Sequence, residues 1–211
     1  MKQFFSVILI TLFGFNANAQ KLGRISLEVN YGLNGNFFVR SYDESIPPPA
    51  KLFYKKKFIG QIAGIELRYN LNSTSSIGLA YANSVNKRKI NYSNGTNARI
   101  LYFTISHIDN FYQLFYERAF SKKNTGFKFN SGIFYLRMKQ QEIDASPAGV
   151  LFEERDFKHY KLEEVGIFLG IHFSKRIDTR FQLGVKSRIY YLLSTNEFEA
   201  ITLTPTLTYT F

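Results

Sequence analysis

The sequence contains no cysteine and no tryptophan, and after residue 20 it has no apolar run long enough for a membrane-spanning helix. Without cysteine there can be no disulfide framework, thiolate nucleophile, zinc–thiolate site or iron–sulfur cluster. A helix that spans a bilayer needs about 18 or more consecutive apolar residues, so a helical membrane protein is not indicated. These absences exclude several function classes before any residue is placed.

Aromatic residues and positive charge are abundant instead. Phe occurs 22 times and Tyr 14 times among 211 residues, and this aromatic share of 17% is too high for a disordered chain. Lys and Arg number 27 against 16 Asp and Glu, a formal net charge of +11. That surplus fits a nucleic acid and an acidic membrane surface equally well. The length fits one domain or a small pair.

The N-terminus has the pattern of a secretory signal peptide. Lys2 precedes an uncharged stretch from Phe4 to Phe15, and Ala17-Asn18-Ala19 supplies small residues at a cleavage site. We expect residues 1–19 to be removed and residues 20–211 to form one barrel domain; the alternative is a buried N-terminal helix or strand. An exported chain meets no cytoplasmic nucleic acid, so we expect no nucleic-acid partner.

The body of the chain alternates between apolar and polar residues with period two, as a strand with two different faces does. Eight such segments follow one another, each of about ten or more residues, which is the length of a tilted strand that crosses a bilayer. The parity is least clear in the segment 100–120. If Tyr112 and Leu114 lie on one face, then Phe111 and Glu117 lie on the other, and the parity upstream of residue 110 stays open.

The connections between these segments alternate in length. Short polar connections are expected at 72–75, 121–126 and 174–178, and long ones at 41–57, 86–99, 140–158 and 193–200. An up-and-down barrel with turns at one rim and loops at the other has this property. The predicted fold class is therefore all-β, an eight-stranded antiparallel up-and-down transmembrane β-barrel with short periplasmic turns and long extracellular loops.

The polar face of the strands predicts a charged lumen. It consists mainly of Gly, Ala, Ser, Thr and Asn, whereas a soluble barrel fills its interior with large apolar side chains. We therefore expect the apolar face to contact lipid and a near-balanced set of charges to be paired inside, since an unpaired buried charge is costly. The predicted lumen residues are Glu28, Glu66, Arg68, Glu117, Lys128, Glu164, Arg180, Lys186 and Arg188. A turn at 174–178 would place Glu164 beside Arg188.

The last segment resembles the terminal strand of bacterial outer-membrane proteins, through Leu207, Tyr209 and the final Phe211. In that class the pattern is read by the barrel-assembly machinery, which the resemblance implies as a partner during biogenesis. The mature chain as a whole resembles the small outer-membrane β-barrel (porin-family) proteins of Bacteroidetes, through its eight strands and mid-strand glycines such as Gly132 and Gly170. The resemblance implies a location in the cell outer membrane, within the cell envelope.

Two features depart from that family pattern. Pro205 is unusual in a terminal strand because proline donates no ladder hydrogen bond. Tryptophan is absent, so Phe and Tyr must form the aromatic belts at the membrane interfaces. The belt expected at the turn end comprises Tyr69, Phe120, Phe127, Phe173, Phe181 and Phe211.

Candidate catalytic chemistry is sparse. His172 and Ser174 have the His-x-Ser spacing of outer-membrane lipid A deacylases. They fall at the turn end, however, whereas such an enzyme works in the outer leaflet near the long loops, so we interpret His172 as a rim histidine. His107 and His159 lack a convincing set of partner carboxylates, and we expect no catalytic residue, cofactor or metal site.

The basic runs and the strand number suggest how the chain would act. Lys55-Lys56-Lys57 and Lys87-Arg88-Lys89 are either solvated loop segments or contacts to lipopolysaccharide phosphates. Eight strands enclose space only for side chains, so no open diffusion pore is expected. We predict a structural or interaction (adhesion) barrel with a plugged lumen, whose partners are outer-membrane lipid, lipopolysaccharide and an extracellular or envelope protein. The alternatives are a lipid A-modifying enzyme and an accessory barrel of a secretion system.

Overall fold

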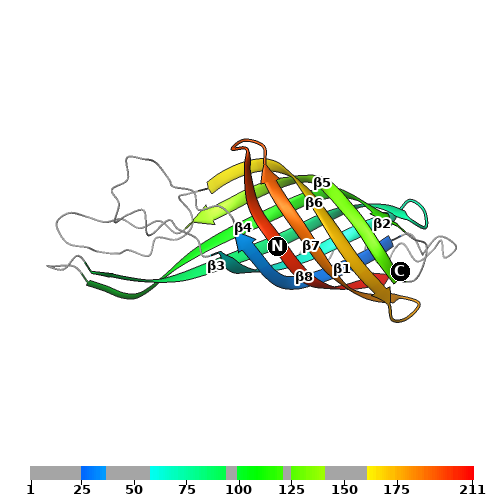
Figure 1. Ribbon diagram of the computed structural model, residues 1–211, viewed down its shortest axis with the longest axis horizontal. Coiled ribbons are helices and arrows are strands. Elements are labelled where there is room, and N and C mark those ends of the chain that lie inside the picture. The colour runs from blue at the N-terminus through cyan, green and yellow to red at the C-terminus, as the bar shows by residue number, and fades with distance from the viewer. Residues whose placement is uncertain (1–24, 37–57, 94–98, 121–124, 141–160) are drawn as a thin grey trace, which may run out of the picture.

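The computed structural model describes residues 25–36, 58–93, 99–120, 125–140 and 161–211. Eight antiparallel strands follow one another in this part of the chain, each paired with its sequence neighbours, and β8 pairs with β1 to close a barrel (Figure 1). The strands are β1 (Ile25–Asn36), β2 (Ile59–Asn70), β3 (Ser75–Ser93), β4 (Arg99–Ala119), β5 (Thr125–Gln140), β6 (Lys161–Arg176), β7 (Phe181–Leu192) and β8 (Glu197–Thr210). The eight-stranded up-and-down barrel predicted from the sequence is confirmed.

None of the described residues forms a helix that is long and apolar enough to cross a membrane.

The period-two pattern of the sequence corresponds to an outer and an inner face of the barrel wall. On β4, Tyr112 and Leu114 are exposed on the outer wall, while Phe111 and Glu117 are buried inside. The alternation continues upstream, since His107 and Asp109 are also buried in the interior. The parity that the sequence left open is thereby settled as far as His107.

Two hairpin turns at one end, those between β2 and β3 and between β6 and β7, lie within the described residues, and both are short. The Asn72 side-chain Oδ1 accepts hydrogen bonds from the backbone N–H groups of Thr74 and Ser75, both at 2.9 Å, as expected of an Asx turn. The β6–β7 turn is made by residues 177–180. All six aromatic residues of the predicted turn-end belt are exposed on the outer wall or at its rim: Tyr69, Phe120, Phe127, Phe173, Phe181 and Phe211.

The opposite end, called here the loop end, differs from the prediction in two places. β8 begins at Glu197, so the predicted long connection 193–200 is a turn of residues 193–196 with Asn196 in the left-handed region at φ 55°. β3 continues to Ser93, so the run Lys87–Lys89 lies on a strand and not in a loop. A strand that extends beyond the barrel does not require an apolar face. The charged sequence of this part of β3 therefore resembles that of a loop.

The β3–β4 hairpin projects beyond its neighbours. The β2–β3 register ends at Gln61 opposite Val85, and the β4–β5 register ends at His107 opposite Gln140, whereas β3 and β4 stay paired as far as Ser93. Among the described strands, residues 86–93 and 99–106 therefore pair only with each other, and Figure 1 shows this hairpin reaching far past the other strands. Both of its outer edges carry backbone groups with no neighbouring strand in the described part of the chain.

The barrel closes along a seam that Pro205 interrupts. The register of β1 and β8 runs from Ser26 opposite Thr210 to Asn30 opposite Thr206, and it resumes only at Leu33 opposite Leu203. Proline has no N–H to donate, which accounts for the interruption beside Pro205. The ladder on either side nevertheless holds the two ends of the chain together.

Candidate functional site

Arg68 lies at the centre of a buried charge cluster in the turn-side half of the lumen. Its guanidinium contacts the Glu28 carboxylate, and it lies 3.2 Å from Glu66 Oε2 and 3.6 Å from Glu117 Oε1. None of these four side chains is more than 3% exposed. A guanidinium suits this position because it stays protonated and offers five donors to several carboxylates at once.

Three further cations complete the cluster. Lys186 contacts Glu28 and lies 2.7 Å from Glu66 Oε2, and Arg188 Nη1 lies 2.8 Å from Glu66 Oε1. Lys128, nearer the turn end, lies 3.4 Å from Glu117 Oε1. Each carboxylate thus has at least two cationic neighbours, which is the condition for burying charge at tolerable cost.

His172 is a member of this cluster and not a rim residue as the sequence suggested. Its side chain is 0% exposed, with Nδ1 3.3 Å from Glu117 Oε2 and Nε2 3.1 Å from Thr206 Oγ1. Gly184 leaves the space for this contact, because a Cβ there would lie 2.6 Å from His172 Nε2. The rim interpretation was wrong because β6 continues two residues beyond Ser174, which moves the turn outward.

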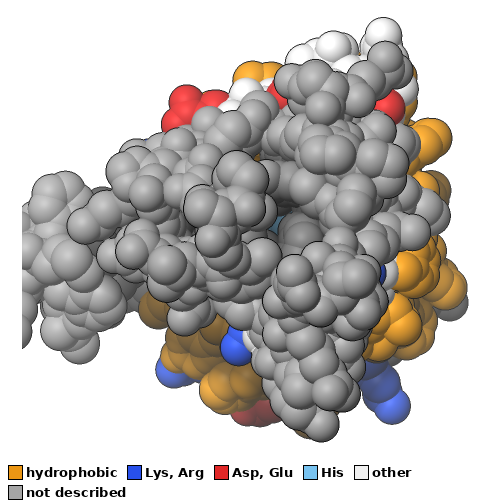
Figure 2. Space-filling view, turned by 90° about the vertical axis from the view of Figure 1, so that its left-hand side faces the viewer, with side chains coloured by type: hydrophobic (Ala, Val, Ile, Leu, Met, Phe, Trp, Pro, Cys, Tyr) orange, Lys and Arg blue, Asp and Glu red, His pale blue; other side chains and the backbone are white. Residues whose placement is uncertain are grey.

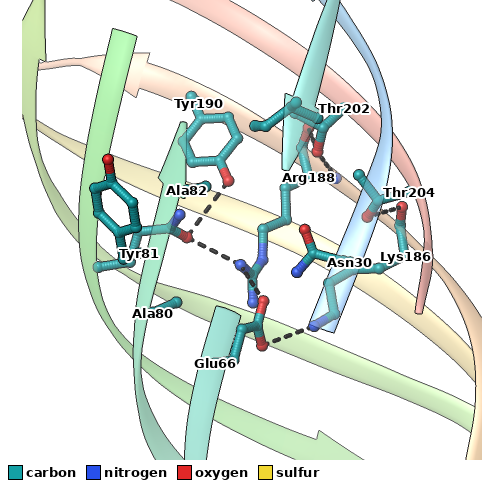
Figure 3. Close-up of a pocket in the computed structure, with 12 residues that line it drawn as sticks. Asn30, Glu66, Ala80, Tyr81, Ala82, Lys186, Arg188, Tyr190, Thr202 and Thr204 are labelled. Carbon is teal, nitrogen blue, oxygen red and sulfur yellow. Dashed lines mark hydrogen bonds and ion pairs between the residues drawn. The ribbon is translucent and has the colours of Figure 1, made fainter. Parts of the chain in front are cut away.

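Arg188 links the charge cluster to the aromatic residues beside it (Figure 3). Nε donates to Asn130 Oδ1 at 3.0 Å and Nη1 donates to Gln113 Oε1 at 2.9 Å. The guanidinium carbon also lies 4.8 Å from the Phe168 ring centroid, a cation–π geometry. Gly170 faces Arg188 across the β6–β7 pair, and a Cβ there would lie 2.7 Å from Arg188 Cγ.

An aromatic layer fills the lumen on the loop side of Arg188. The Tyr190 ring lies 4.7 Å from Phe111, 5.3 Å from Phe134 and 5.6 Å from Phe168, measured between centroids. All four side chains are at most 1% exposed. The sequence prediction placed small polar residues inside and most aromatics outside, so this layer corrects it. The parity of Phe111, opposite to that of Tyr112, was the signal that could have revealed it.

Little empty space remains between these layers. A cavity lined by Glu66, Gln113, Arg188 and Tyr190 offers about 10 Å³ to the centres of water molecules, which is room for about one. Within the described ranges, no group of three or more His, Asp and Glu side chains is placed to hold a metal ion. The described part of the lumen thus contains a charge cluster and an aromatic layer, with this small cavity between them.

The loop-side end of the lumen is polar again, which the sequence did not single out. Asn34 Nδ2 donates to Ser84 Oγ at 2.7 Å, and His107, Asp109 and Glu199 are each 1% exposed. Glu199 is inside because a bulge in the β7–β8 pairing between Tyr190 and Tyr191 shifts the alternation of β8.

Two of the predicted lumen charges lie elsewhere. Arg180 is an exposed residue of the β6–β7 turn and donates to the Tyr209 hydroxyl at 3.2 Å. Glu164 is half-buried at the loop end and accepts a hydrogen bond from Ser194, and the residue opposite Arg188 is Gly170. The predicted Glu164–Arg188 pair was wrong because the true turn lies nearer to Phe181. The other predicted lumen charges are brought together as described above.

The remaining predicted residues are on the outer wall or outside the described ranges. Leu207, Tyr209 and Phe211 face outward at the turn end, where Tyr209 and Phe211 make an edge-to-face contact at 5.0 Å. Lys87 and Lys89 are exposed, and Arg88 is half-buried on the other face of β3. Lys55, Lys56, Lys57 and His159 lie outside the described residues.

Comparison with known proteins identifies the fold. No protein-family model and no curated protein matches the sequence. Among solved structures, the chain is similar to Neisserial surface protein A (NspA), with 10% identity, a TM-score of 0.52, and coverage of 89% of this chain and 97% of that one. The attachment invasion locus protein Ail of Yersinia pestis (14% identity, 90% and 99% coverage) and the N-terminal barrel of Pseudomonas aeruginosa OprF (11%, 88% and 97%) give TM-scores of 0.49 and 0.48. The similarity to NspA, together with the closed barrel described above, shows that the chain has the fold of small eight-stranded outer-membrane barrels.

Proposed function

We propose that this chain is an integral protein of the bacterial outer membrane that binds another protein through its projecting β3–β4 hairpin. Residues 1–19 are its signal peptide, residues 20–211 its barrel domain, and Leu207, Tyr209 and Phe211 its signal for the barrel-assembly machinery. The proposal places it among the porin-family barrels of Bacteroidetes type. The apolar outer wall supports the membrane location, since exposed side chains such as Leu79 (61%) and Leu203 (53%) would be costly in water.

The observation that carries the binding role is the hairpin itself. Residues 86–93 and 99–106 extend past the last β2 and β5 partners, so within the described part of the chain the outer edges of β3 and β4 have no strand beside them and present backbone donors and acceptors. An open edge is the surface to which an extended segment of another protein adds as a further strand. Lys87 and Lys89 on this hairpin favour an acidic partner segment.

The test removes the hairpin without disturbing the barrel. Asn86 and His107 are opposite each other, so replacing residues 87–106 by Asn-Gly joins them through a two-residue turn. Proteoliposomes with the shortened chain should lose capture by an immobilised preparation of the organism's envelope and secreted proteins, while keeping heat-modifiable gel mobility. Equal capture of both forms would contradict the hairpin role. Lys87→Gln with Lys89→Gln is the matched control, in which the edges remain and capture should persist in large part.

The lumen is proposed to be closed to solutes. The support is the ion-pair cluster around Arg68, the aromatic layer around Tyr190, and a cavity between them with room for about one water molecule. In planar bilayers the reconstituted protein should give no stable channel openings over the voltage range in which the bilayer itself is stable. Large, lasting openings would contradict a closed lumen.

No enzymatic activity is part of this proposal. Both ring nitrogens of His172 are engaged, by Glu117 and Thr206, at a position that is 0% exposed. Ser174 is likewise buried, at the turn end of the barrel. A lipid A deacylase must bring its nucleophile to a glycolipid in the outer leaflet, next to the opposite rim. We therefore interpret His172 and Ser174 as two successive inward-facing residues of β6.

A further inference from the structure

Within the described residues, the loop-end charges of the outer wall lie on the side of the barrel formed by β3 to β6. On β1, β2, β7 and β8 the outward residues of the described ranges are uncharged, for example Tyr31, Gln61, Tyr191 and Phe198. Strands β3 and β5, which lie on either side of β4, instead present outward cations at this end. These are Lys87, Lys89, Arg137 and Lys139. Figure 2, which looks at the loop end, shows Lys and Arg side chains beside the hydrophobic outer wall, and Asp and Glu side chains as well.

On the turn side of these cations is a row of tyrosines, beyond which Arg137 lies two residues, Lys139 four and Lys87 six residues along the strands. Tyr81, Tyr112 and Tyr135 occupy adjacent positions on β3, β4 and β5, with centroid separations of 5.3 Å and 6.1 Å. From Phe120 in the turn-end belt to Asn110 above this tyrosine row is about 33 Å along the strand and about 25 Å of height at a typical tilt. That height is the thickness of the apolar band of a membrane barrel, so the tyrosine row marks its outer boundary.

Above the tyrosine row, Asn83, Asn110 and Arg137 form a row of polar groups that is fixed by its own hydrogen bonds. Tyr81 Oη and Asn83 Nδ2 both donate to Asn110 Oδ1, at 2.8 Å and 3.0 Å. Asn110 Nδ2 in turn donates to the Arg137 carbonyl at 3.3 Å. This amide row is preorganised on three strands, so a polar ligand that contacts it need not order it first.

The lysines beside the amide row are available to a ligand. Arg137 Nε lies 3.6 Å from Glu163 Oε1, whereas Lys87 and Lys139 form no ion pair with another residue of the described ranges. Lys87 is on β3 and Lys139 on β5, one on each side of β4, so their strands are about 10 Å apart. A single phosphate cannot engage both at once without drawing the side chains together over β4.

We propose that this wall binds one diphosphorylated glycolipid of the outer leaflet, the lipid A part of lipopolysaccharide. Lys87 takes one phosphate, Lys139 with Arg137 takes the other, the sugars lie over Asn83 and Asn110, and the acyl chains run down past the tyrosine row. Charge-assisted bonds to phosphate and contact of tyrosine with the acyl boundary are the interactions that such a ligand requires. This inference rests on the outer-membrane location given under the proposed function.

The test measures lipid retention by the full mature chain, folded in detergent micelles, using native mass spectrometry. The probes are diphosphoryl lipid A, monophosphoryl lipid A and phosphatidylglycerol. The wild type should retain one diphosphoryl lipid A with an affinity at least about tenfold above that for either other lipid, because only it offers two separated phosphates. Lys87→Gln with Lys139→Gln should remove that preference while heat-modifiable mobility stays normal.

The matched control is Arg118→Gln with Lys175→Gln, which removes two exposed cations from the turn end of the same outer wall. Its lipid A affinity should equal that of the wild type. The inference is overturned if phosphatidylglycerol binds as tightly as diphosphoryl lipid A, or if the control loses as much affinity as the Lys87 and Lys139 variant. Absence of a lipid A preference in the wild type, with hairpin-dependent capture intact, would overturn this site alone, whereas a soluble, heat-insensitive chain would overturn the proposed function itself.

Discussion

Arg68→Met is expected to lower the free energy of unfolding by about 3–5 kcal/mol, since it leaves a buried charge cluster without its central cation. Glu28 and Glu117 each lose a partner, and neither carboxylate is more than 3% exposed to water that could compensate. The measurement is urea unfolding of the folded barrel in lipid vesicles, followed by heat-modifiable gel mobility. The absence of tryptophan makes gel mobility more useful here than intrinsic fluorescence.

The matched control for that variant is Arg180→Met. Arg180 was also assigned to the lumen by the sequence pattern, but it is exposed in the β6–β7 turn, where substitution should cost less than about 1 kcal/mol. Combining Arg68→Met with Glu28→Gln should recover part of the loss, because Glu28, which would keep only Lys186 as a cationic neighbour, is then no longer a buried carboxylate. Equal losses for Arg68→Met and Arg180→Met would contradict the cluster.

Tyr190→Ala should cost a further large amount, about 3–5 kcal/mol, because it empties the middle of the aromatic layer. The ring contacts Phe111, Phe134 and Phe168, and its neighbours come from strands that cannot close the gap without disturbing the backbone ladder. The same urea series measures this loss. If the lumen wall were loosely packed, the substitution would be tolerated.

Two variants show which part of Tyr190 is responsible. Tyr190→Phe keeps the ring and loses only the hydroxyl contact to Gln113 Oε1 at 3.4 Å, so its effect should stay within about 1 kcal/mol. Tyr31→Ala removes a ring of the same size from the outer wall, where it is 60% exposed, and should cost much less than Tyr190→Ala. A larger loss of unfolding free energy for Tyr31→Ala would mean that aromatic side chains stabilise the barrel mainly from its lipid-facing wall.

The lumen cluster also explains why a narrow barrel can hold ionised groups at all. Its carboxylates and cations come from different strands around the barrel, as in the contact of Glu28 on β1 with Lys186 on β7. The pairs of Lys186 with Glu28 and of Arg188 with Glu66 therefore tie together strands that are not neighbours in the sheet. The aromatic layer above adds apolar burial without polar atoms that need partners, apart from the Tyr190 hydroxyl. The two layers together favour one fixed arrangement of the lumen.

Much of the fold was predictable because period two is a local property. The alternation of Leu203, Leu207 and Tyr209 with threonines requires no knowledge of any other strand, and neither does the assignment of Glu28 or Lys186 to the inner face. The loop end was less predictable. Lys87 looked like a loop residue because three charged residues in a row, Lys87-Arg88-Lys89, interrupt the alternation of apolar and polar residues.

What the sequence by itself determined is therefore the strand number, the closed antiparallel architecture and the face on which most charges lie. Only the tertiary structure decided which charges meet, because the partners depend on where each turn lies. The β6–β7 turn lies later in the chain than predicted, so Gly170 and not Glu164 is opposite Arg188. Arg188 pairs with Glu66 instead. The tertiary structure likewise decided that Lys87 and Lys139, distant in sequence, lie on either side of β4. Local periodicity fixes the direction of a side chain, while register and closure fix its neighbours.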